Sequence, residues 1–359
     1  MSQIRAGIVG CGKVADMHAV ALRDLDEANF VAVCDANRDR ADRFASKYQV
    51  GAYESVDEMI NKAGVEAVLV CTPHPMHELP TVAAARRGVH VLVEKPLASS
   101  LEACDAMIRA AQDGNAKLGV VSQRRLFEPV QRMKAAIDAG KIGKPVLGTF
   151  SMFSWRDQAY YESDPWRGRW ETEGGGVLVN QSPHQLDLMQ WFMGEIAEVS
   201  GYWANLNHPT IEVEDTAVAI VRFRSGALGS IVTSLSQKPG IYTKVHVHGS
   251  NGASVGVQTD TGASFVAGVS EIADPPLNDV WTIPGEEGYL TVFEAEDRAR
   301  FKSIDATQHY HTLQIQDFLN SILDDRDPMV TGREGRVVVE LFTAIYQSNE
   351  LRRPIEFPI

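Results

Sequence analysis

Long apolar runs, cysteines and positive charges are all scarce in this sequence. Its 359 residues include only four cysteines, which lack the close pairing of a zinc site and are too few for a disulfide scaffold. No apolar stretch approaches the roughly 18 residues that a membrane-spanning helix needs. Residues Met1–Arg5 run straight into a short strand-like segment instead of a secretion signal. We therefore expect a protein without a membrane partner, located in the reducing cytoplasm.

Acidic residues outnumber basic ones by 47 to 34, which gives a net charge of −13. This balance argues against nucleic acid as a partner, because proteins that bind a polyanion gather positive charge on one face. Apolar residues make up 44% of the chain, enough to build globular cores. A chain of this length usually divides into more than one domain, so we expect two.

The first third of the chain alternates short apolar segments with helical patterns. The strand-like segments are Ile4–Val9, Phe30–Cys34, Ala67–Cys71, Val89–Val93 and Lys117–Val121. The helix-like segments are Val14–Leu25, Arg38–Tyr48, Leu79–Arg87 and Leu101–Gln112. Strands that are apolar throughout and alternate with helices are typical of a parallel sheet covered on both faces. We predict an α/β fold that begins with a Rossmann dinucleotide-binding domain over residues 1–123.

After this domain the pattern changes to alternating apolar and polar residues. The alternating segments are Ala197–Asn205, Thr216–Phe223, Ala227–Leu235 and Thr243–His248, and the helical patterns are Val130–Ala139, Thr312–Leu323 and Arg333–Glu350. A period of two indicates an antiparallel sheet with one buried face. We predict an α+β domain over residues 124–359 with a large, open, mainly antiparallel sheet. The other face of that sheet is either solvated or joins two copies into a homodimer or homotetramer.

A glycine-rich turn between the first strand and the first helix is the strongest local signal. It reads Gly10-x-Gly12-x-x-Ala15, in which the glycines permit a tight turn and close approach of a pyrophosphate. Asp35 ends the second strand, where a carboxylate binds the adenosine ribose of NAD and repels the 2′-phosphate of NADP. Arg38 and Arg40 could offset that repulsion. The alternative is that the glycines serve only a turn and that Asp35 is a surface charge.

Two further segments follow parallel strands at the sheet edge where ligands bind in such folds. Cys71-Thr72-Pro73-His74-Pro75-Met76-His77 follows one strand, and Glu94-Lys95-Pro96 follows the next. Lys95 standing alone would be an ordinary solvated lysine. Its place at a strand end favours a ligand contact.

Taken together, these motifs resemble the Gfo/Idh/MocA family of oxidoreductases over essentially the whole chain. The resemblance also includes Gly174-Gly175-Gly176, followed by Asn180, His184 and Asp187, and the closing segment Gly332–Arg336. It implies an NAD(P)-dependent reaction at a secondary alcohol or hemiacetal of a sugar, cyclitol or related polyol, with Lys95 beside the reacting oxygen. The family usually carries an Asp four residues before the His, and this chain has Asn180 there.

The resemblance and the chemistry of alcohol oxidation together assign three roles. Imidazole suits proton transfer near neutral pH, so we expect His184 to be the general base. Lys95 would stabilise the developing alkoxide, and Asn180 would position the substrate, since an amide cannot accept a proton as a carboxylate does. Residues 174–194 form either one helix or a helix that restarts at Pro183 with Ser182 as its cap.

The remaining predicted contacts form a cofactor set and a substrate set. The cofactor set is Gly10, Gly12, Lys13, Val14, Asp35, Thr72, Pro73, His74, His77, Glu94, Lys95 and Gln123. The substrate set is Lys95, Arg124, Trp155, Trp166, Arg167, Asn180, His184, Asp187 and His311. Any single aromatic or basic member could instead pack the interior, and Asp187 could orient a neighbour. No metal site is expected, because the histidine pairs lack supporting carboxylate or thiolate ligands.

Three functions remain open from the sequence. The first is an NAD-dependent sugar, glycoside or cyclitol dehydrogenase. The second is a glycosidase that keeps NAD tightly bound, and the third is a non-catalytic NAD-dependent sensor of the same fold. Retention of Lys95 and His184 argues against the sensor, which needs no proton transfer. The sequence leaves the substrate and the direction of the reaction undetermined.

Overall fold

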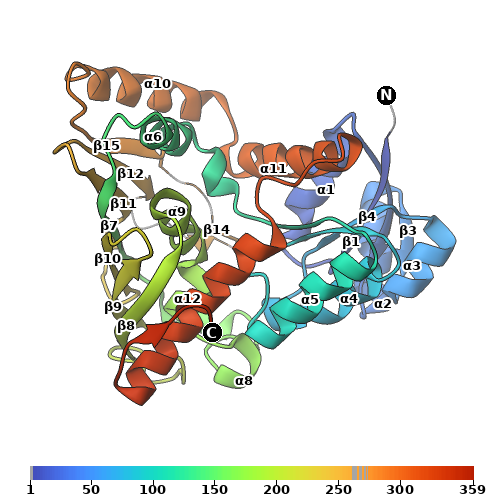
Figure 1. The fold of residues 1–359 in the computed structure, drawn as a ribbon. Helices are drawn as coiled ribbons and strands as arrows, with labels where there is room; N and C mark the ends of the chain where they lie inside the picture. Colours follow the sequence, from blue (N-terminus) through green and yellow to red (C-terminus); the bar gives the residue numbers. More distant parts are fainter. Residues whose placement is uncertain (1–2, 261–264, 267–268, 271, 273) are drawn as a thin grey trace. The chain divides into compact units, whose positions relative to one another are not determined.

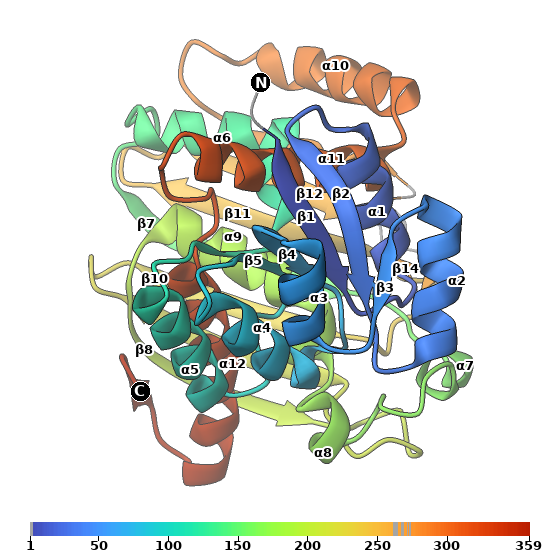
Figure 2. The ribbon, with the colours of Figure 1, turned by 90° about the vertical axis from the view of Figure 1, so that its right-hand side faces the viewer.

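The first sheet consists of six short strands that are apolar almost throughout. They are β1 (Ile4–Val9), β2 (Ala28–Cys34), β3 (Gly51–Tyr53), β4 (Ala67–Val70), β5 (His90–Val93) and β6 (Leu118–Val120). All pairs are parallel, in the order β3-β2-β1-β4-β5-β6. The computed structural model describes residues 3–260, 265–266, 269–270, 272 and 274–359, and it confirms the predicted Rossmann sheet (Figure 2).

Helices connect these strands and bury both faces of the sheet. They are α1 (Ala15–Asp24), α2 (Arg38–Tyr48), α3 (Val56–Ala63), α4 (Glu78–Ala85) and α5 (Leu101–Asp113), with a 3₁₀ turn η1 (His74–Met76). Asn37, Ser55 and Ser100 each precede a helix and accept a hydrogen bond from the backbone N–H three residues on. These caps satisfy donors that the first helical turn leaves open, and they fix where α2, α3 and α5 begin.

The chain forms two compact units, and the last third contributes to both. The first unit comprises residues 1–123 with 308–339, and the second comprises 124–307 with 340–359. Segment 308–339 includes most of α11 (Ala306–Leu323), whose Ile315, Phe318 and Leu319 are buried in the core of the first unit. The predicted boundary at residue 123 coincides with a break between the units. Residues 308–339 belong to the first unit, because this apolar face of α11 packs in the first core. The sequence had placed all of residues 124–359 in one domain.

The second unit contains an eight-stranded sheet within the described residues. Its strands are β7 (Pro145–Phe153), β8 (Ile196–Ala204), β9 (Thr216–Phe223), β10 (Leu228–Ser234), β11 (Tyr242–Gly249), β12 (Ser254–Asp260), β15 (Leu277–Trp281) and β16 (Ile355–Glu356). The order is β15-β12-β11-β7-β10-β9-β8-β16, and only the β7–β10 pair among these is parallel. The predicted mainly antiparallel sheet is therefore confirmed. A separate ribbon joins β13 (Phe265–Val266) and β14 (Val269–Ser270).

Helices cover one face of this large sheet. They include α6 (Glu128–Asp138), which follows the 3₁₀ turn η2 (Gln123–Leu126), then the π-helical turn η3 (Val177–Gln181), α9 (Pro183–Met193), α10 (Tyr289–Ser303) and the end of α12 (Gly332–Leu351). Two short helices, α7 (Gln158–Glu162) and α8 (Trp170–Glu173), lie along the chain between β7 and η3. Helix α9 lies along β7 and β11, as Figure 1 shows. Among the described residues, no helix is long and apolar enough to cross a membrane.

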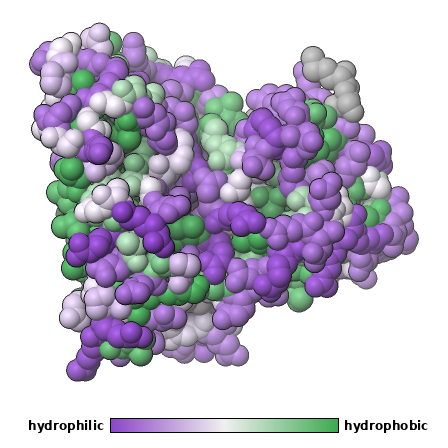
Figure 3. Space-filling model, viewed as in Figure 1, coloured by the Kyte–Doolittle hydropathy of each residue, from purple (hydrophilic) through white to green (hydrophobic). Residues whose placement is uncertain are grey.

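The other face of the large sheet keeps apolar side chains at the surface. Along β9 the buried residues alternate with exposed ones, and Val218 and Ile220 are 47% and 66% exposed. Tyr202 on β8 and Leu228 on β10 are also exposed on neighbouring strands. Figure 3 shows hydrophobic residues along the left margin of the view, where this sheet lies. We call Tyr202, Val218, Ile220 and Leu228 the open face.

Candidate active site

The glycine-rich turn has the geometry that dinucleotide binding requires. Gly10 has a φ of +91°, and a Cβ there would lie 2.8 Å from the backbone nitrogen of Thr72, so only glycine fits. A Cβ at Gly12 would meet no atom within 4 Å, which leaves space beside the loop for a pyrophosphate. Lys13 and Val14 form the turn that leads into α1. These residues therefore fit a bound dinucleotide, held at the N-terminus of α1.

Asp35 directly follows β2 and supports the same loop. Its Oδ2 accepts a hydrogen bond from the backbone N–H of Cys11 at 2.9 Å, and its Oδ1 accepts one from Asn37 at 2.8 Å. Arg40 places Nη1 3.6 Å from Oδ2. Arg38 instead pairs with Asp42 one helical turn on, with 2.9 Å between Nε and Oδ2. Arg40 is thus the basic residue whose charge bears on Asp35.

The segment after β4 is tied to the segment after β5 by His77. Its Nδ1 lies 3.0 Å from the carbonyl oxygen of Pro96, and its Nε2 lies 2.9 Å from that of Thr72. Burial lowers the pKa of His77, although these backbone contacts act the other way. The His77 ring thus lies between the carbonyl oxygens of the two loops, and the ring nitrogen that carries the proton donates to one of them. Sequence reasoning did not assign this role. Contacts of Thr72, Pro73, His74 and His77 with a cofactor stay predictions.

Glu94 anchors the residue that we expect to act in catalysis. Its Oε2 accepts a hydrogen bond from the backbone N–H of Lys95 at 3.2 Å, and its Oε1 lies 2.7 Å from Nε2 of His18. Burial opposes ionisation of Glu94, but the hydrogen bond from His18 outweighs it together with nearby positive charges, and the pKa falls to about 2. The ring of His311 on α11 packs edge-on against His18, with 6.1 Å between centroids. Lys95 itself is half-buried.

The predicted cofactor residues of the first unit gather at one edge of its sheet. Gly10, Asp35, Thr72 and Glu94 each follow a parallel strand directly or within two residues, and buried Gln123 follows β6. Because these strands are parallel, their carboxyl ends meet at the same edge, which is where ligands bind in such sheets. Sequence reasoning missed His18. The available signal was its place one turn into the helix that follows the glycine loop.

In the second unit, Asn180 and His184 lie on consecutive helical segments. Asn180 belongs to the π-helical turn η3, and α9 restarts at Pro183, so that His184 is the second residue of α9. Of the two predicted arrangements, the restart at Pro183 is confirmed. The hydroxyl of Ser182 lies 3.1 Å from that of Thr233 and makes no capping bond, so the predicted side-chain cap is wrong.

Buried Glu214 organises the glycine run before Asn180. Its carboxylate accepts hydrogen bonds from the backbone N–H groups of Gly176 and Leu178 at 2.8 and 2.9 Å, and from the hydroxyl of Tyr346 at 2.9 Å. Burial raises the pKa of Glu214 to about 7, although these three donors oppose the shift. Gly175 has a φ of +154°, and a Cβ there would collide with the Tyr346 hydroxyl. Sequence reasoning missed Glu214, which lies far from the glycines along the chain.

Asp187 and Arg124, both predicted to bind substrate, form ion pairs inside the second unit. Asp187 accepts two hydrogen bonds from buried Arg125, at 2.8 and 2.6 Å. Arg124 donates to Asp260 at 2.7 Å and to Thr259 at 2.9 Å. Asp187 therefore orients a neighbour, which is one of the two roles left open by the sequence. Contacts of either residue with a substrate stay predictions.

The predicted aromatic and basic residues pack into two clusters of the second unit. The guanidinium of Arg167 lies 4.5 Å from the ring centre of Trp166 and 4.4 Å from that of Tyr160. Trp155 packs against His208, with 5.7 Å between ring centroids. These contacts are cation–π and ring contacts that also stabilise the fold.

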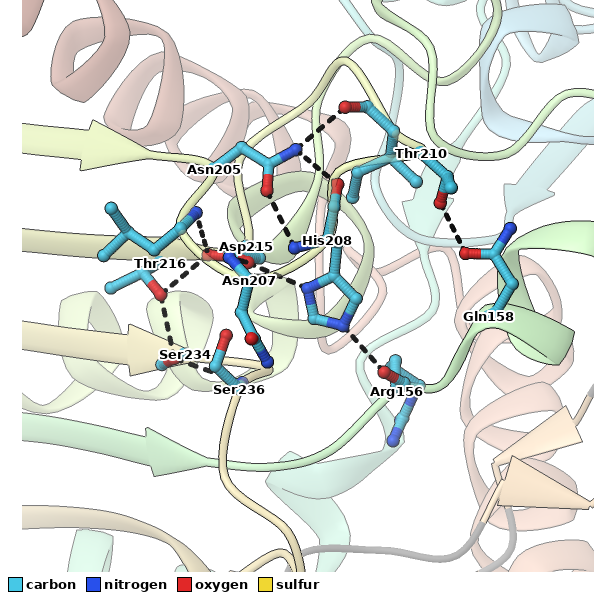
Figure 4. A network of polar contacts seen from close by, with 12 residues as sticks. Arg156, Gln158, Asn205, Asn207, His208, Thr210, Asp215, Thr216, Ser234 and Ser236 are labelled. Carbon is cyan, nitrogen blue, oxygen red and sulfur yellow. Dashed lines mark hydrogen bonds and ion pairs between the residues drawn. The ribbon is translucent and has the colours of Figure 1, made fainter.

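His208 belongs to a buried polar network (Figure 4). Its Nδ1 lies 2.8 Å from Oδ2 of Asp215, and its Nε2 lies 2.8 Å from the carbonyl oxygen of Arg156. The hydrogen bond to Asp215 raises the pKa of His208. Asp215 also accepts from the backbone N–H groups of Leu206 and Asn207. The network fixes the loop between β8 and β9 and the segment that carries Trp155.

These observations define a class of protein: a dinucleotide-dependent oxidoreductase with a Rossmann unit and a second unit built on an open sheet. A sequence profile described as "Oxidoreductase family, NAD-binding Rossmann fold" matches residues 4–122, and one described as "GFO/IDH/MocA C-terminal domain" matches residues 130–255. The chain belongs to the Gfo/Idh/MocA family, as the sequence motifs predicted.

Among the described residues, no group of three or more His, Cys, Asp or Glu side chains could hold a metal ion.

Relatives of known activity span the whole chain. Scyllo-inositol 2-dehydrogenase (NAD(+)) of Bacillus subtilis is 31% identical, over 99% of this chain and 97% of its own. Myo-inositol 2-dehydrogenase of Thermotoga maritima is 28% identical over 98% of both. The WlbA dehydrogenase of Bordetella pertussis, solved with NADH and UDP-GlcNAcA, is 30% identical with a TM-score of 0.82 over 99% of both chains. The protein is an oxidoreductase of the sugar and cyclitol dehydrogenase type.

Proposed function

We propose that this enzyme interconverts a secondary alcohol and a ketone on a ring carbon of a sugar, glycoside or cyclitol. NAD, when bound, supplies the acceptor for the hydride that leaves the alcohol carbon. The observation that carries the proposal is Lys95, held by the buried Glu94 at the same sheet edge as the glycine loop. The two inositol dehydrogenases that match nearly the full chain support a cyclitol or related polyol as substrate.

Three side chains have separate roles in the proposed reaction. The imidazole of His184 removes the hydroxyl proton as general base. The ammonium of Lys95 stabilises the negative charge that develops on the same oxygen. Asn180 orients the substrate through its amide. Oxidation and reduction use the same groups, so the proposal holds for either direction.

Asp35 supports NAD over NADP as the cofactor. Its carboxylate lies beside the glycine loop, where it favours ribose hydroxyls and repels a 2′-phosphate. Arg40, 3.6 Å away, weakens that repulsion without removing the carboxylate.

The open face supports assembly into a homodimer or homotetramer. Four exposed apolar side chains lie on three adjacent strands of this face, with Tyr202 directly opposite Val218 and Leu228 opposite Arg222, and exposed apolar residues gathered on one face are typical of association surfaces. All four cysteines are buried and unpaired, which supports the expected reducing compartment, the cytoplasm.

The test is NADH formation, followed by absorbance, with NAD and a panel of cyclitols, sugars and glycosides. We expect one substrate group to yield NADH. Lys95→Ala should lower kcat at least a hundredfold while the Kd for NAD changes less than threefold. Lys62→Ala, at an exposed side chain of α3, is the control and should behave as wild type. NAD binding without NADH from any member of the panel would contradict the proposal.

A further inference from the structure

The side-chain amide of Asn180 is held from two sides within the second unit. Its Nδ2 lies 2.5 Å from Oε1 of Glu173 and 3.1 Å from the hydroxyl oxygen of Tyr160. A carboxylate can only accept hydrogen bonds, so the atom facing Glu173 must be the amide nitrogen. This contact fixes which way the amide of Asn180 is turned.

Glu173 is itself held in place. It is 1% exposed, and its Oε2 accepts a hydrogen bond from the backbone N–H of Gly168 at 2.5 Å. Both carboxylate oxygens therefore face N–H donors, an arrangement that only the ionised side chain satisfies fully. Gly168 has a φ of +77°, which places its N–H in a turn that favours glycine.

Tyr160 forms the second support of Asn180. Its hydroxyl oxygen also lies 2.5 Å from Nη1 of Arg167 and 2.7 Å from Nε2 of Gln181. Burial raises the pKa of Tyr160 to about 12, so it stays a neutral phenol at physiological pH. The Asn180 amide nitrogen thus donates to Glu173 and faces the Tyr160 hydroxyl, which it shares with the shorter contacts from Arg167 and Gln181. Because Nδ2 faces Glu173 and Tyr160, the carbonyl oxygen Oδ1 lies on the other side of the amide, and a carbonyl oxygen can accept two hydrogen bonds.

We propose that Glu173 is a positioning residue for the reaction. It turns the amide of Asn180 so that Oδ1 accepts a hydrogen bond from a substrate hydroxyl, and it places a negative charge one hydrogen bond behind that amide. Asn180 supplies the hydrogen-bond acceptor and Glu173 supplies the negative charge. A carboxylate at position 180 would supply both, but here the charge stays buried. The proposal rests on the proposed function. It adds that the substrate hydroxyl that contacts Asn180 must donate a hydrogen bond. A substrate methylated on that oxygen has no hydrogen to donate and should therefore not react.

The first test is Glu173→Gln. Glutamine offers one acceptor and one donor, so either Gly168 or Asn180 loses its acceptor. We expect kcat to fall at least tenfold, with the Kd for NAD and the circular dichroism spectrum unchanged. Glu171→Gln is the matched control, because Glu171 lies on the same short helix and is exposed. It should keep wild-type kcat and KM.

The second test exchanges the two groups in the double variant E173Q/N180D. The glutamine then donates to the carboxylate at position 180, which restores one amide and one carboxylate in contact. We expect kcat to recover at least fivefold over E173Q, and the kcat–pH profile to gain an acid-side ionisation from the relocated carboxylate. The single variant N180D sets two carboxylates against each other, so its activity should fall as the pH rises.

The results separate this proposal from the proposed function. If the wild type makes NADH but E173Q keeps kcat and KM within twofold, the role of Glu173 is wrong and the dehydrogenase activity stands. The role of Glu173 is also wrong if E173Q/N180D is no more active than E173Q and its pH profile matches the wild type. If the wild type itself gives no NADH, the proposed function fails and the role of Glu173 fails with it.

Discussion

The imidazole of His18 lies 2.7 Å from the carboxylate of Glu94, and both side chains are buried. Because a carboxylate only accepts, Nε2 of His18 carries the proton in this contact. The Nδ1 atom has no hydrogen-bond partner among the described residues. His18 belongs to the helix that follows the glycine loop, and Glu94 directly precedes Lys95. The contact thus ties the dinucleotide loop to Lys95.

Replacing His18 by Ala should destabilise the enzyme and misplace Lys95. The buried carboxylate of Glu94 would lose its donor, which costs about 2–3 kcal/mol in the free energy of unfolding. Urea unfolding measures this loss, and kcat should fall together with it. His18→Gln keeps an N–H donor and should recover part of both. Equal stability of His18→Ala and the wild type would contradict the role of this contact.

The contact between His18 and Glu94 also predicts how the free energy of unfolding depends on pH in the acid range. The pKa of Glu94 is about 2 in the folded protein, against an ordinary value of 4.5. A carboxyl with a lowered pKa stabilises the fold above its unfolded pKa, and this contribution is lost as the pH falls from 4.5 towards 2. The difference in unfolding free energy between wild type and His18→Ala should therefore narrow between about pH 5 and pH 3. A constant difference would assign the effect of His18 to packing alone.

Asp35 and Arg40 should act in opposite directions on cofactor choice. Asp35→Ala removes the repulsion of a 2′-phosphate and the acceptor for Cys11, so NAD should bind more weakly and the preference for NAD over NADP should fall. Arg40→Ala should raise that preference. Kd values for NADH and NADPH, measured by the fluorescence of the reduced nucleotides, test this. Asp42→Ala is the control, because Asp42 pairs with Arg38. An unchanged ratio in Asp35→Ala would refute the cofactor assignment.

Glu214 should give stability a dependence on pH near neutrality. Its pKa is about 7 in the folded protein, against 4.5 ordinarily, because burial disfavours the charge. The folded state then holds a proton that the unfolded state has lost, so stability falls as the pH rises from 4.5 through 7, by up to about 3 kcal/mol. Glu214→Gln should lack this fall, although the amide would face the N–H of Gly176 and lower stability overall.

Unfolding free energies at pH 5 and pH 8 measure the effect of Glu214. The matched control is Glu350→Gln, since Glu350 is exposed near the end of α12. It should follow the wild type at both values. Parallel curves for wild type and Glu214→Gln would show that Glu214 does not titrate in this range.

Local patterns predicted several of the strands that are apolar throughout or alternate cleanly. The bounds of β1 and β9 were predicted to the residue for that reason. Strand β7 was missed, because it begins with exposed Val146 and Leu147 and shows no alternation there. The return of α11 to the first unit was missed because it depends on contacts between residues about 200 positions apart, such as Gln314 with Ser122.

The candidate site, like the fold, was predicted from the sequence only where the signal is local. Gly10, Asp35 and Lys95 were found because each carries its function in a local motif at a strand end. The partners that hold the site were not found, since the pairing of His18 with Glu94 spans 76 positions and that of Glu214 with Leu178 spans 36. No local pattern encodes such a pairing. It follows only from the packed fold.

Placing a charge on the open face should separate the subunits. Ile220 is 66% exposed in the middle of β9, between β8 and β10, on the same face as Val218 two residues earlier. In a symmetric interface the same patch meets its own copy, so Ile220→Lys would bury two like charges near each other. We expect size-exclusion chromatography with light scattering to show an oligomer for the wild type and a monomer for Ile220→Lys. Val292→Lys, at an exposed apolar site on α10, is the matched control and should leave the mass unchanged. A wild-type monomer, or an Ile220→Lys variant that stays oligomeric, would mean that this sheet face is solvated and that any assembly uses another surface.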